Sequence, residues 1–143
     1  EGLEFYTIGQ RKGIKIGGTG PYYVVEKDFE KNNLIVTNDQ NDERLFKDKI
    51  VLENINWISG KKPSLPLKCL AQHRYQSEMF EVEVCPVKFS KAGSPKAKFN
   101  RVNKYIVKTK KPQRAVTPGQ SLVLYKKKLF SRDYQVLGGG VIG

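Results

Sequence analysis

The segment Tyr6–Gly13, with the sequence YTIGQRKG, holds the densest set of residues that could contact an anionic ligand. It combines two glycines and an amide with the fixed cations Arg11 and Lys12. A glycine-rich loop presents backbone N–H groups, and together with fixed positive charge these groups bind phosphate oxygens. Arg11 and Lys12 are therefore candidate phosphate-binding residues, and Gln10 lies beside them in the loop. The alternative is a tight glycine turn that carries two solvated cations.

A second candidate is the run His73–Gln76, which follows an apolar segment. Arg74 offers a rigid fork of donors for phosphate, and Tyr75 offers a flat ring on which a base or sugar can stack. The same residue types also suit a strand end that meets water, and composition does not decide between the two. His73 has no obvious carboxylate or serine partner in the sequence, which argues against a catalytic role for it.

The run Thr117–Gln120 has the sequence TPGQ, with proline and glycine at its second and third places. This pattern predicts a type II turn, because the third position needs a positive φ. The turn would deliver Gln120 to the start of a strand. There the amide could contact a polar base edge or a phosphate, or it could be an ordinary surface amide.

The overall charge favours a polyanionic partner. The 143 residues include 26 Lys and Arg against 14 Asp and Glu, a net charge of +12 with a pI near 9.7. Such a balance is typical of proteins that bind nucleic acid, although a merely soluble basic surface is the alternative. The lysine clusters Lys108–Lys111 and Lys126–Lys128 would extend the electrostatic footprint.

The residues that usually carry chemistry are sparse. Cys69, Cys85 and the single histidine do not have the spacing of a zinc site, and two cysteines do not make a disulfide framework. Cysteines within strand-like runs are usually buried small hydrophobes. The chain has no P-loop and no evident pair of catalytic carboxylates. We therefore predict a binding role, with no catalytic residue, metal or cofactor held by this chain.

Two features concern the place of the chain in a cell and in a polypeptide. No apolar stretch approaches the ~20 residues of a membrane-spanning helix, and no signal-peptide pattern opens the chain, so we expect a cytoplasmic protein without membrane contact. Only five residues precede Tyr6, and position 1 is not methionine. We therefore expect the C-terminal part of a longer protein.

The elements that must position these residues are strands. Short alternating or β-branched runs separated by turns predict an all-β fold, with a small barrel or sandwich, and no segment has a sustained helical period. The expected strands are Tyr22–Lys27, Leu34–Thr37, Ile50–Ile58, Leu67–Tyr75, Met79–Cys85, Lys96–Phe99, Tyr105–Val107, Ser121–Tyr125 and Tyr134–Leu137.

The stretch Ser59–Pro66 contains two prolines, a glycine and two lysines, which is typical of a linker. We place a domain boundary there. The predicted domains are residues 1–62 and residues 63–143, each a small β-rich unit.

Several blocks of sequence also stand in a characteristic order. They are Tyr6–Gly13 with Ile16–Gly18, then Tyr22–Val24, Arg74–Tyr75, Ala115–Tyr125 and Leu137–Ile142. With these blocks the chain resembles the C-terminal part of the bacterial tRNA-specific 2-thiouridylase family, MnmA (also called TrmU), over essentially its whole length. The first block and the block AVTPGQSLVLY are the most specific.

The resemblance implies a three-part enzyme that binds tRNA. An N-terminal PP-loop domain would use ATP with Mg²⁺ to adenylate the wobble uridine, and a cysteine persulfide, charged by a sulfur-relay protein or cysteine desulfurase, would deliver sulfur. This chain would be the central β-rich domain, residues 1–62, and the C-terminal β-barrel, residues 63–143, which resembles the barrels of translation factors. It lacks the family's ATP loop, and Cys69 and Cys85 match neither catalytic cysteine of the family.

The resemblance also assigns site residues. Arg74 and Tyr75 match the family's Arg-Tyr pair and Gln120 its TPGQ amide, all implied to contact tRNA. Gln10, Arg11 and Lys12 match the signature loop, which would contact either tRNA or the catalytic domain. The chain departs from the family in carrying Lys15 and more basic turns, which would strengthen phosphate attraction without changing sequence choice.

Two other functions compete with this one. The chain could be a non-enzymatic RNA-binding module of the translation-factor type, because fold does not determine function. It could also be a docking module for the sulfur donor.

Overall fold

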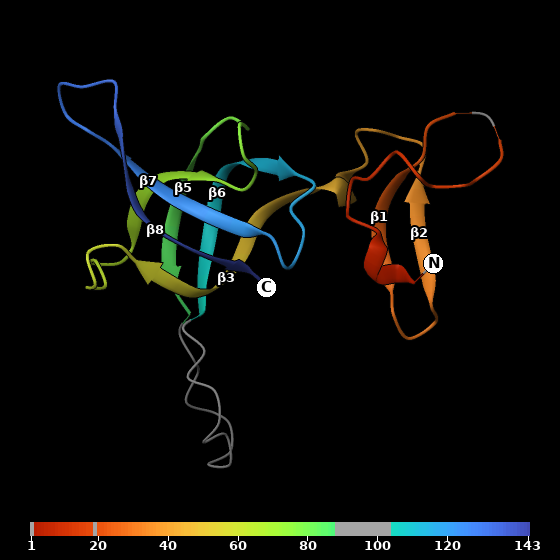
Figure 1. The fold of residues 1–143 in the computed structure, drawn as a ribbon, viewed down its shortest axis with the longest axis horizontal. Coiled ribbons are helices and arrows are strands. Elements are labelled where there is room, and N and C mark those ends of the chain that lie inside the picture. Colours follow the sequence, from red (N-terminus) through yellow and green to blue (C-terminus); the bar gives the residue numbers. More distant parts are fainter. Residues whose placement is uncertain (1, 19, 88–103) are drawn as a thin grey trace, which may run out of the picture. The chain divides into compact units, whose positions relative to one another are not determined.

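The computed structural model describes residues 2–18, 20–87 and 104–143 (Figure 1). Their regular structure is almost entirely β, which confirms the predicted fold class. The chain forms two compact units. Unit 1 comprises Glu1–Lys47 with Pro112–Thr117, and unit 2 comprises Asp48–Lys111 with Pro118–Gly143.

Unit 1 is built on a hairpin formed by the first two expected strands. Strands β1 (Tyr23–Asp28) and β2 (Asn33–Thr37) pair antiparallel, and short 3-10 helices lie at Leu3–Phe5 (η1) and Glu43–Leu45 (η2). Alternate side chains of a strand face one side of the sheet, which gives the hairpin an apolar face. Its core joins that face to η2 and contains Tyr23, Val25 and Leu45, with Ile8, Ile35 and Phe46 packed against them.

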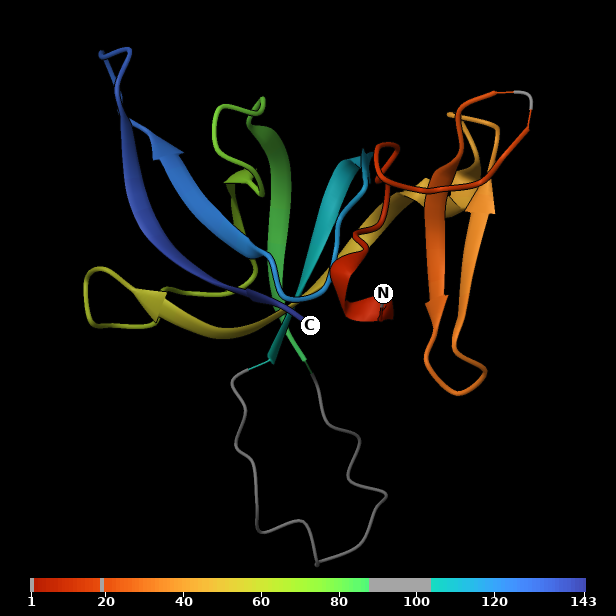
Figure 2. The ribbon, with the colours of Figure 1, turned by 45° about the vertical axis from the view of Figure 1, so that its right-hand side comes forward.

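Unit 2 contains a closed antiparallel barrel with the strand order β3-β6-β5-β4-β7-β8 (Figure 2). Closure leaves no unpaired sheet edge, so a small barrel satisfies its backbone groups without covering helices. The strands are β3 (Phe46–Trp57), β4 (Leu67–Gln72), β5 (Phe80–Pro86), β6 (Lys104–Arg114), β7 (Ser121–Lys127) and β8 (Tyr134–Ile142). The predicted barrel is thereby confirmed.

Alternating side chains fill the barrel, and a bulge in β3 shifts the alternation there. In β5, Val82 and Val84 are buried while Glu81 is exposed, as the sequence predicts. In β3 the buried residues shift from Leu52 to Ile55, an odd spacing. The register shifts between Glu53 and Asn56, and Asn54 there has φ +51°. This β-bulge turns Ile55 inward, and asparagine tolerates the left-handed conformation that it requires.

Strand β8 continues through three glycines, which extends it beyond the predicted Tyr134–Leu137. A Cβ atom at Gly138 would collide with the backbone oxygen of Asn56, and one at Gly140 would lie 2.6 Å from the backbone oxygen of Glu53. Glycine is therefore required here because β3 approaches too closely for side chains.

The structure differs from the sequence-based expectation in the position of the domain boundary and in the length of β6. The linker Ser59–Pro66 connects β3 to β4 inside unit 2, since β3 is one of the barrel strands, whereas the sequence divides the chain at residues 62 and 63. Strand β6 is longer than the predicted Tyr105–Val107. The predicted strand Lys96–Phe99 lies outside the described residues.

Candidate nucleic-acid interface

The first candidate surface is the turn that follows β4. The Ser77 backbone N–H and hydroxyl donate to the carbonyl of Arg74, at 3.1 and 2.8 Å, and Gln72 Nε2 donates to the carbonyl of Ser77 at 2.6 Å. Gln76 occupies a left-handed conformation at φ +60°. These bonds hold the turn, so the exposed side chains of Arg74 and Tyr75 extend from a fixed backbone; Tyr75 is 92% exposed.

The second candidate surface is the turn that precedes β7. Gly119 has φ +87°, which agrees with the predicted type II turn. The Gly119 N–H donates to the carbonyl of Ile142, and the Ile142 N–H donates to the carbonyl of Gln120, both at 2.7 Å. The end of β8 therefore holds the backbone of Gln120 in place, and the half-buried side chain starts from a fixed position.

Strand pairing brings these two turns to the same end of the barrel. β4 and β7 are antiparallel, and Gln72 at the end of β4 pairs with Val123 near the start of β7. The His73–Gln76 turn and the Gln120 turn therefore lie beside one another, although they are more than forty residues apart in sequence. The structure thus unites Arg74, Tyr75 and Gln120 in one surface, which we call the turn pair.

His73 lies at the centre of the turn pair. Burial lowers the pKa of His73, the positive charge of Arg74 lowers it further, and the Gln120 amide opposes both. Its ring meets Phe80 edge-on, with the ring centroids 5.9 Å apart. Among the described residues, His73 Nδ1 and Gln120 Oε1 are buried without a hydrogen bond of standard geometry. This environment suits a packed, neutral imidazole.

The signature loop of unit 1 is organised differently. Gln10 Oε1 accepts from the Thr7 N–H, and Gln10 Nε2 donates to the Lys12 carbonyl, both at 2.9 Å. The Gly9 N–H donates to Val24 O at 2.7 Å. The Gln10 amide therefore bonds within the loop, and the Gly9 N–H, expected to face an anion, ties the loop to strand β1. The side chains of Lys12 and its neighbour Arg11 are exposed.

Glycine is needed at position 9 for two reasons. Its φ is +78°, and a Cβ atom there would lie 2.5 Å from the Cβ of Ala115. Ala115 in turn donates its N–H to the carbonyl of Leu45 at 2.7 Å, so it cannot easily retreat. Because the loop and the Ala115 segment approach so closely, any side chain at position 9 would clash.

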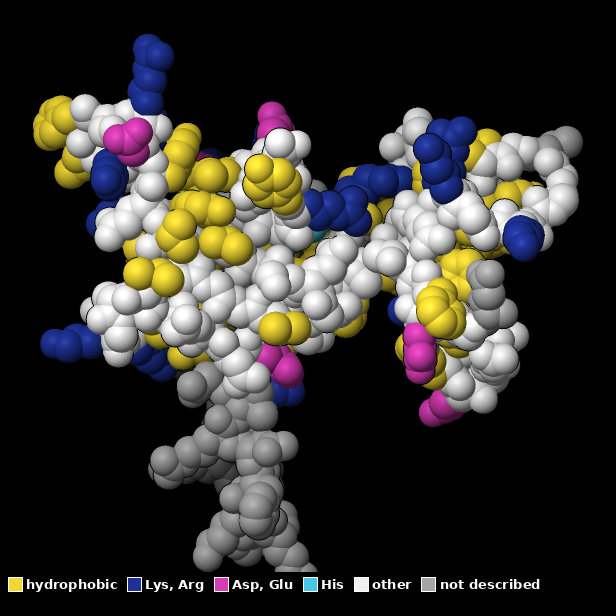
Figure 3. Space-filling model, in the orientation of Figure 1, with side chains coloured by type: hydrophobic (Ala, Val, Ile, Leu, Met, Phe, Trp, Pro, Cys, Tyr) yellow, Lys and Arg dark blue, Asp and Glu magenta, His cyan; other side chains and the backbone are white. Residues whose placement is uncertain are grey.

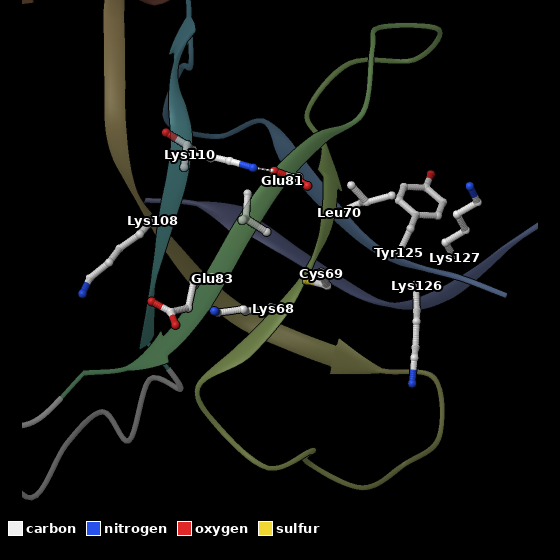
Figure 4. Close-up of a pocket in the computed structure, with 12 residues that line it drawn as sticks. Lys68, Cys69, Leu70, Glu81, Glu83, Lys108, Lys110, Tyr125, Lys126 and Lys127 are labelled. Carbon is white, nitrogen blue, oxygen red and sulfur yellow. Dashed lines mark hydrogen bonds and ion pairs between the residues drawn. The ribbon is translucent and has the colours of Figure 1, made fainter. Parts of the chain in front are cut away.

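A third candidate surface is a groove on the barrel with a volume of about 750 Å³. Strands β4, β5, β6 and β7 line it, and Figure 4 shows lysine side chains extending from them. The groove is lined by five lysines and two glutamates, so its net charge is positive and suits a phosphate backbone. The charged residues are Lys68, Lys108, Lys110, Lys126 and Lys127 with Glu81 and Glu83.

Two groups in the groove have shifted pKa values. The hydrogen bond and charge of Lys110 lower the pKa of Glu81, and this exposed ion pair partly neutralises the groove (Figure 4). Burial raises the pKa of Cys69 to about 11. Its thiol therefore stays protonated near neutral pH and is a poor nucleophile, which fits the structural role expected for it.

Sequence reasoning found part of this groove. The clusters Lys108–Lys111 and Lys126–Lys128 were expected to be cationic, and both contribute lysines to it. Lys68 was missed, because a single lysine in an apolar strand gives little signal. Its outward position follows only from the pairing of Lys68 with Glu83 on β5.

Two other kinds of feature, a metal cluster and a membrane-spanning helix, are absent from the described residues. No three histidine, cysteine or acidic side chains among them gather closely enough to hold a metal ion. None of the helices in these ranges has the length and hydropathy needed to cross a membrane.

Fold and site together define a small, basic β-barrel protein. A family model described as the tRNA methyl transferase PRC-barrel domain matches residues 1–38, and one described as the Aminomethyltransferase beta-barrel domain matches residues 47–142. The second match covers most of unit 2, including β3, and ends at the last residue of β8.

Curated relatives match along almost the whole chain. A tRNA-specific 2-thiouridylase MnmA of Marinomonas sp. (strain MWYL1) is 41% identical over 146 residues, which cover 99% of this chain and 33% of the relative. Proteins of the same name from Alkalilimnicola ehrlichii and Shouchella clausii are 37% and 36% identical, again over 99% of this chain, and 35% and 34% of their own lengths are covered.

The chain belongs to the MnmA family of tRNA-specific 2-thiouridylases, an enzyme family, and corresponds to its C-terminal portion. It spans about a third of the length of the curated relatives it matches. The resemblance noted in the sequence is thereby confirmed.

Proposed function

We propose that this chain is the tRNA-binding C-terminal part of a tRNA-uridine 2-sulfurtransferase, which thiolates the wobble uridine using ATP and a cysteine persulfide. The observation that carries the proposal is the turn pair. An exposed arginine and tyrosine stand beside a glutamine on a rigid, basic barrel. The names of the relatives, which describe tRNA-specific 2-thiouridylases, support the same substrate.

Each residue of the turn pair has a role that its chemistry allows. Arg74 binds a phosphate through its donor fork, and Tyr75 stacks on an exposed base or sugar. Gln120 Oε1 is buried, so its Nε2 group is the one that donates to an RNA acceptor. The lysines of the groove attract the phosphate backbone without reading sequence. The signature loop with Gln10, Arg11 and Lys12 contacts tRNA or the catalytic domain through its two exposed cations, and Gln10 shapes the loop.

The chemical step belongs to the rest of the polypeptide in this proposal. A PP-loop domain binds ATP with Mg²⁺ and activates the uridine, and a sulfur-relay protein or cysteine desulfurase supplies the sulfur. This chain contributes no catalytic residue, metal ligand or cofactor contact. The cytoplasmic location expected from the sequence is part of the same proposal.

Binding of tRNA to the 143-residue chain tests the first half of the proposal. Fluorescence anisotropy with labelled tRNA should show an affinity that falls steeply and log-linearly as salt rises, because phosphate contacts release counterions. The double variant Arg74→Glu/Gln120→Ala should bind at least tenfold more weakly. The matched control Lys61→Glu, in the β3–β4 loop, should change affinity far less. Equal losses of affinity in the double variant and in Lys61→Glu would show that tRNA binding depends only on the net charge of the chain.

Thiolation by the full-length protein tests the second half. Mass spectrometry of tRNA from cells that depend on this enzyme should detect 2-thiouridine with the wild-type protein and much less with the double variant. Full thiolation with the double variant would show that the site is assigned wrongly. Absence of 2-thiouridine with the wild-type protein would reject the activity itself.

A further inference from the structure

The tip of the β7–β8 hairpin, residues Lys128–Asp133, is a part of the barrel to which the proposed function assigns no role. In both ribbon views this hairpin extends past the ends of the neighbouring strands (Figure 1; Figure 2). Hydrophobic side chains and cations gather at its end in the space-filling view (Figure 3). It lies at the end of β7 opposite to Gln120, since β7 runs from Ser121 to Lys127.

The tip is a closed turn with internal hydrogen bonds. The Lys128 N–H donates to the carbonyl of Asp133 at 3.0 Å and closes a loop of four residues. The Ser131 hydroxyl donates to the Asp133 carboxylate at 2.6 Å and accepts from the Asp133 N–H at 3.0 Å. These bonds hold the second half of the loop, so the first half is presented from an ordered base.

That first half exposes two large apolar side chains. Leu129 is 85% exposed and Phe130 is 106% exposed, the highest value among the exposed large hydrophobic residues described. Phe130 also has φ +63°, a conformation that bulky residues rarely adopt. A strained backbone that carries an aromatic ring fully into water contributes nothing to the core, which points to a function outside the barrel.

Cations flank Phe130 along the chain. Lys126, Lys127, Lys128 and Arg132 are all exposed, while the nearby carboxylate of Asp133 accepts a hydrogen bond from Ser131. Lys127 lines both the hollow at the tip and the lysine groove, so the two basic surfaces are continuous. An aromatic ring set among cations at the end of a positive groove is the arrangement by which proteins hold unpaired nucleotides.

We propose that the hairpin tip is a second RNA contact, in which Phe130 stacks on an unpaired base while the adjacent lysines and Arg132 bind the flanking phosphates. This inference rests on the proposed function, because it takes tRNA as the partner. It adds a contact at the far end of β7 from the turn pair. The barrel would then hold RNA at two places joined by the groove.

Two other occupants fit the observations less well. A stable protein interface buries about 800 Å² on each partner, far more than two side chains at a loop tip supply. An anionic membrane would attract the same lysines and accept the same apolar residues. However, the lysine groove that continues from the tip lies along the barrel wall, which suits a strand of phosphates better than a bilayer surface.

The test compares three substitutions at one position in the 143-residue chain. Phe130→Ala and Phe130→Leu should both weaken binding of tRNA and of oligouridylate about tenfold, because only a flat ring stacks on a base. Phe130→Trp should restore wild-type affinity, and its introduced indole should be quenched by RNA. A blunt RNA duplex, whose bases are already stacked, should bind all four proteins equally.

Two controls distinguish a loss of base stacking from a loss of charge and from a loss of folded protein. Phe130 has no packing role, so the melting temperature of each variant should match the wild type. The three substitutions should leave the slope of log affinity against log salt unchanged, whereas Lys127→Gln should reduce it. Wild-type RNA affinity in Phe130→Ala would overturn the inference, as would full retention of affinity in Phe130→Leu.

Other results would show whether the proposed function or only the assignment of the hairpin tip is wrong. If the wild-type chain fails to bind tRNA at all, the proposed function fails together with the inference. If the wild type binds tRNA but Phe130→Ala binds it equally well, only the tip assignment fails. If Phe130→Ala instead loses binding to phosphatidylserine vesicles and keeps binding to RNA, the tip is a membrane contact and the inference is wrong.

Discussion

The signature loop of unit 1 and the turn pair of unit 2 use glutamine in opposite ways. In the loop, both ends of the Gln10 amide form hydrogen bonds with the loop's own backbone. In the turn pair, Gln120 Oε1 is buried beside His73 without a standard hydrogen bond among the described residues. The Gln10 amide is therefore used up within its own loop, whereas the buried Oε1 of Gln120 leaves the Nε2 group of that amide as the donor for a ligand.

The two regions also present their cations differently. Arg74 extends from a turn that hydrogen bonds hold at the end of a barrel strand. Arg11 and Lys12 are exposed on a loop whose shape depends on glycines. The most distinctive sequence motif of this chain, Tyr6–Gly13, is therefore a structural loop that carries two exposed cations. The less conspicuous Arg74–Tyr75 pair has the geometry of a contact surface.

The largest expected effect tests the structural interpretation of the loop. Gly9→Ala should destabilise unit 1 by about 2–4 kcal/mol, because it adds a clash with Ala115 to a positive φ. Gly13→Ala is the matched control, since Gly13 has φ +81° but meets only the Gln10 side chain, at 3.6 Å. It should cost about 1 kcal/mol. Hydrogen exchange of unit 1 amides measures both, and equal costs would contradict the packing argument.

The next effect compares the two arginines. Arg74→Glu should weaken tRNA binding roughly 10–100-fold, the range expected when a direct phosphate or base contact is lost. Arg11→Glu makes the same charge change on the loop and should weaken binding only about threefold through long-range attraction. Anisotropy titrations at one salt concentration measure both. The reverse order would place the main RNA contact on unit 1.

A smaller effect compares the two glutamines. Gln10→Ala should destabilise the protein by about 1 kcal/mol, because it removes two hydrogen bonds of the loop, and should leave tRNA affinity of the folded protein unchanged. Gln120→Ala should do the opposite, weakening tRNA binding several-fold with little change in stability. Urea denaturation and anisotropy on both variants form the test. If Gln120→Ala loses stability and Gln10→Ala does not, the roles assigned to the two glutamines are reversed.

The smallest effect is the pH dependence that His73 confers. Its folded pKa lies below its ordinary value of 6.5, so the unfolded state takes up the proton first as pH falls. Stability should therefore be complete above pH 6.5, decrease as pH falls below it, and level off once the folded state is protonated too. His73→Phe should show a flatter profile between pH 7 and 5. Identical urea midpoints across that range would contradict the lowered pKa.

Local patterns were enough to predict much of this protein. Alternating and β-branched runs predicted a strand at the position of each of the eight strands observed among the described residues, although β6 and β8 are longer than predicted, because a half-buried strand must repeat every two residues. The TPGQ turn was predictable because its third position needs glycine. Family membership followed from ordered motifs such as Tyr6–Gly13. The net charge, which depends on composition alone, pointed to a polyanionic partner.

The tertiary structure decided what local patterns cannot express. The Gln72–Val123 pairing brought Arg74 and Gln120 together, and it depends on which strands are neighbours in the closed barrel. The loop Ser59–Pro66, linker-like by composition, joins two barrel strands for the same reason. Phe130 was hidden in a charged turn, and only its position at the end of the hairpin reveals its full exposure. Sequence determines which residues prefer a strand or a turn, but contacts between distant segments arise only when the whole chain closes into a barrel.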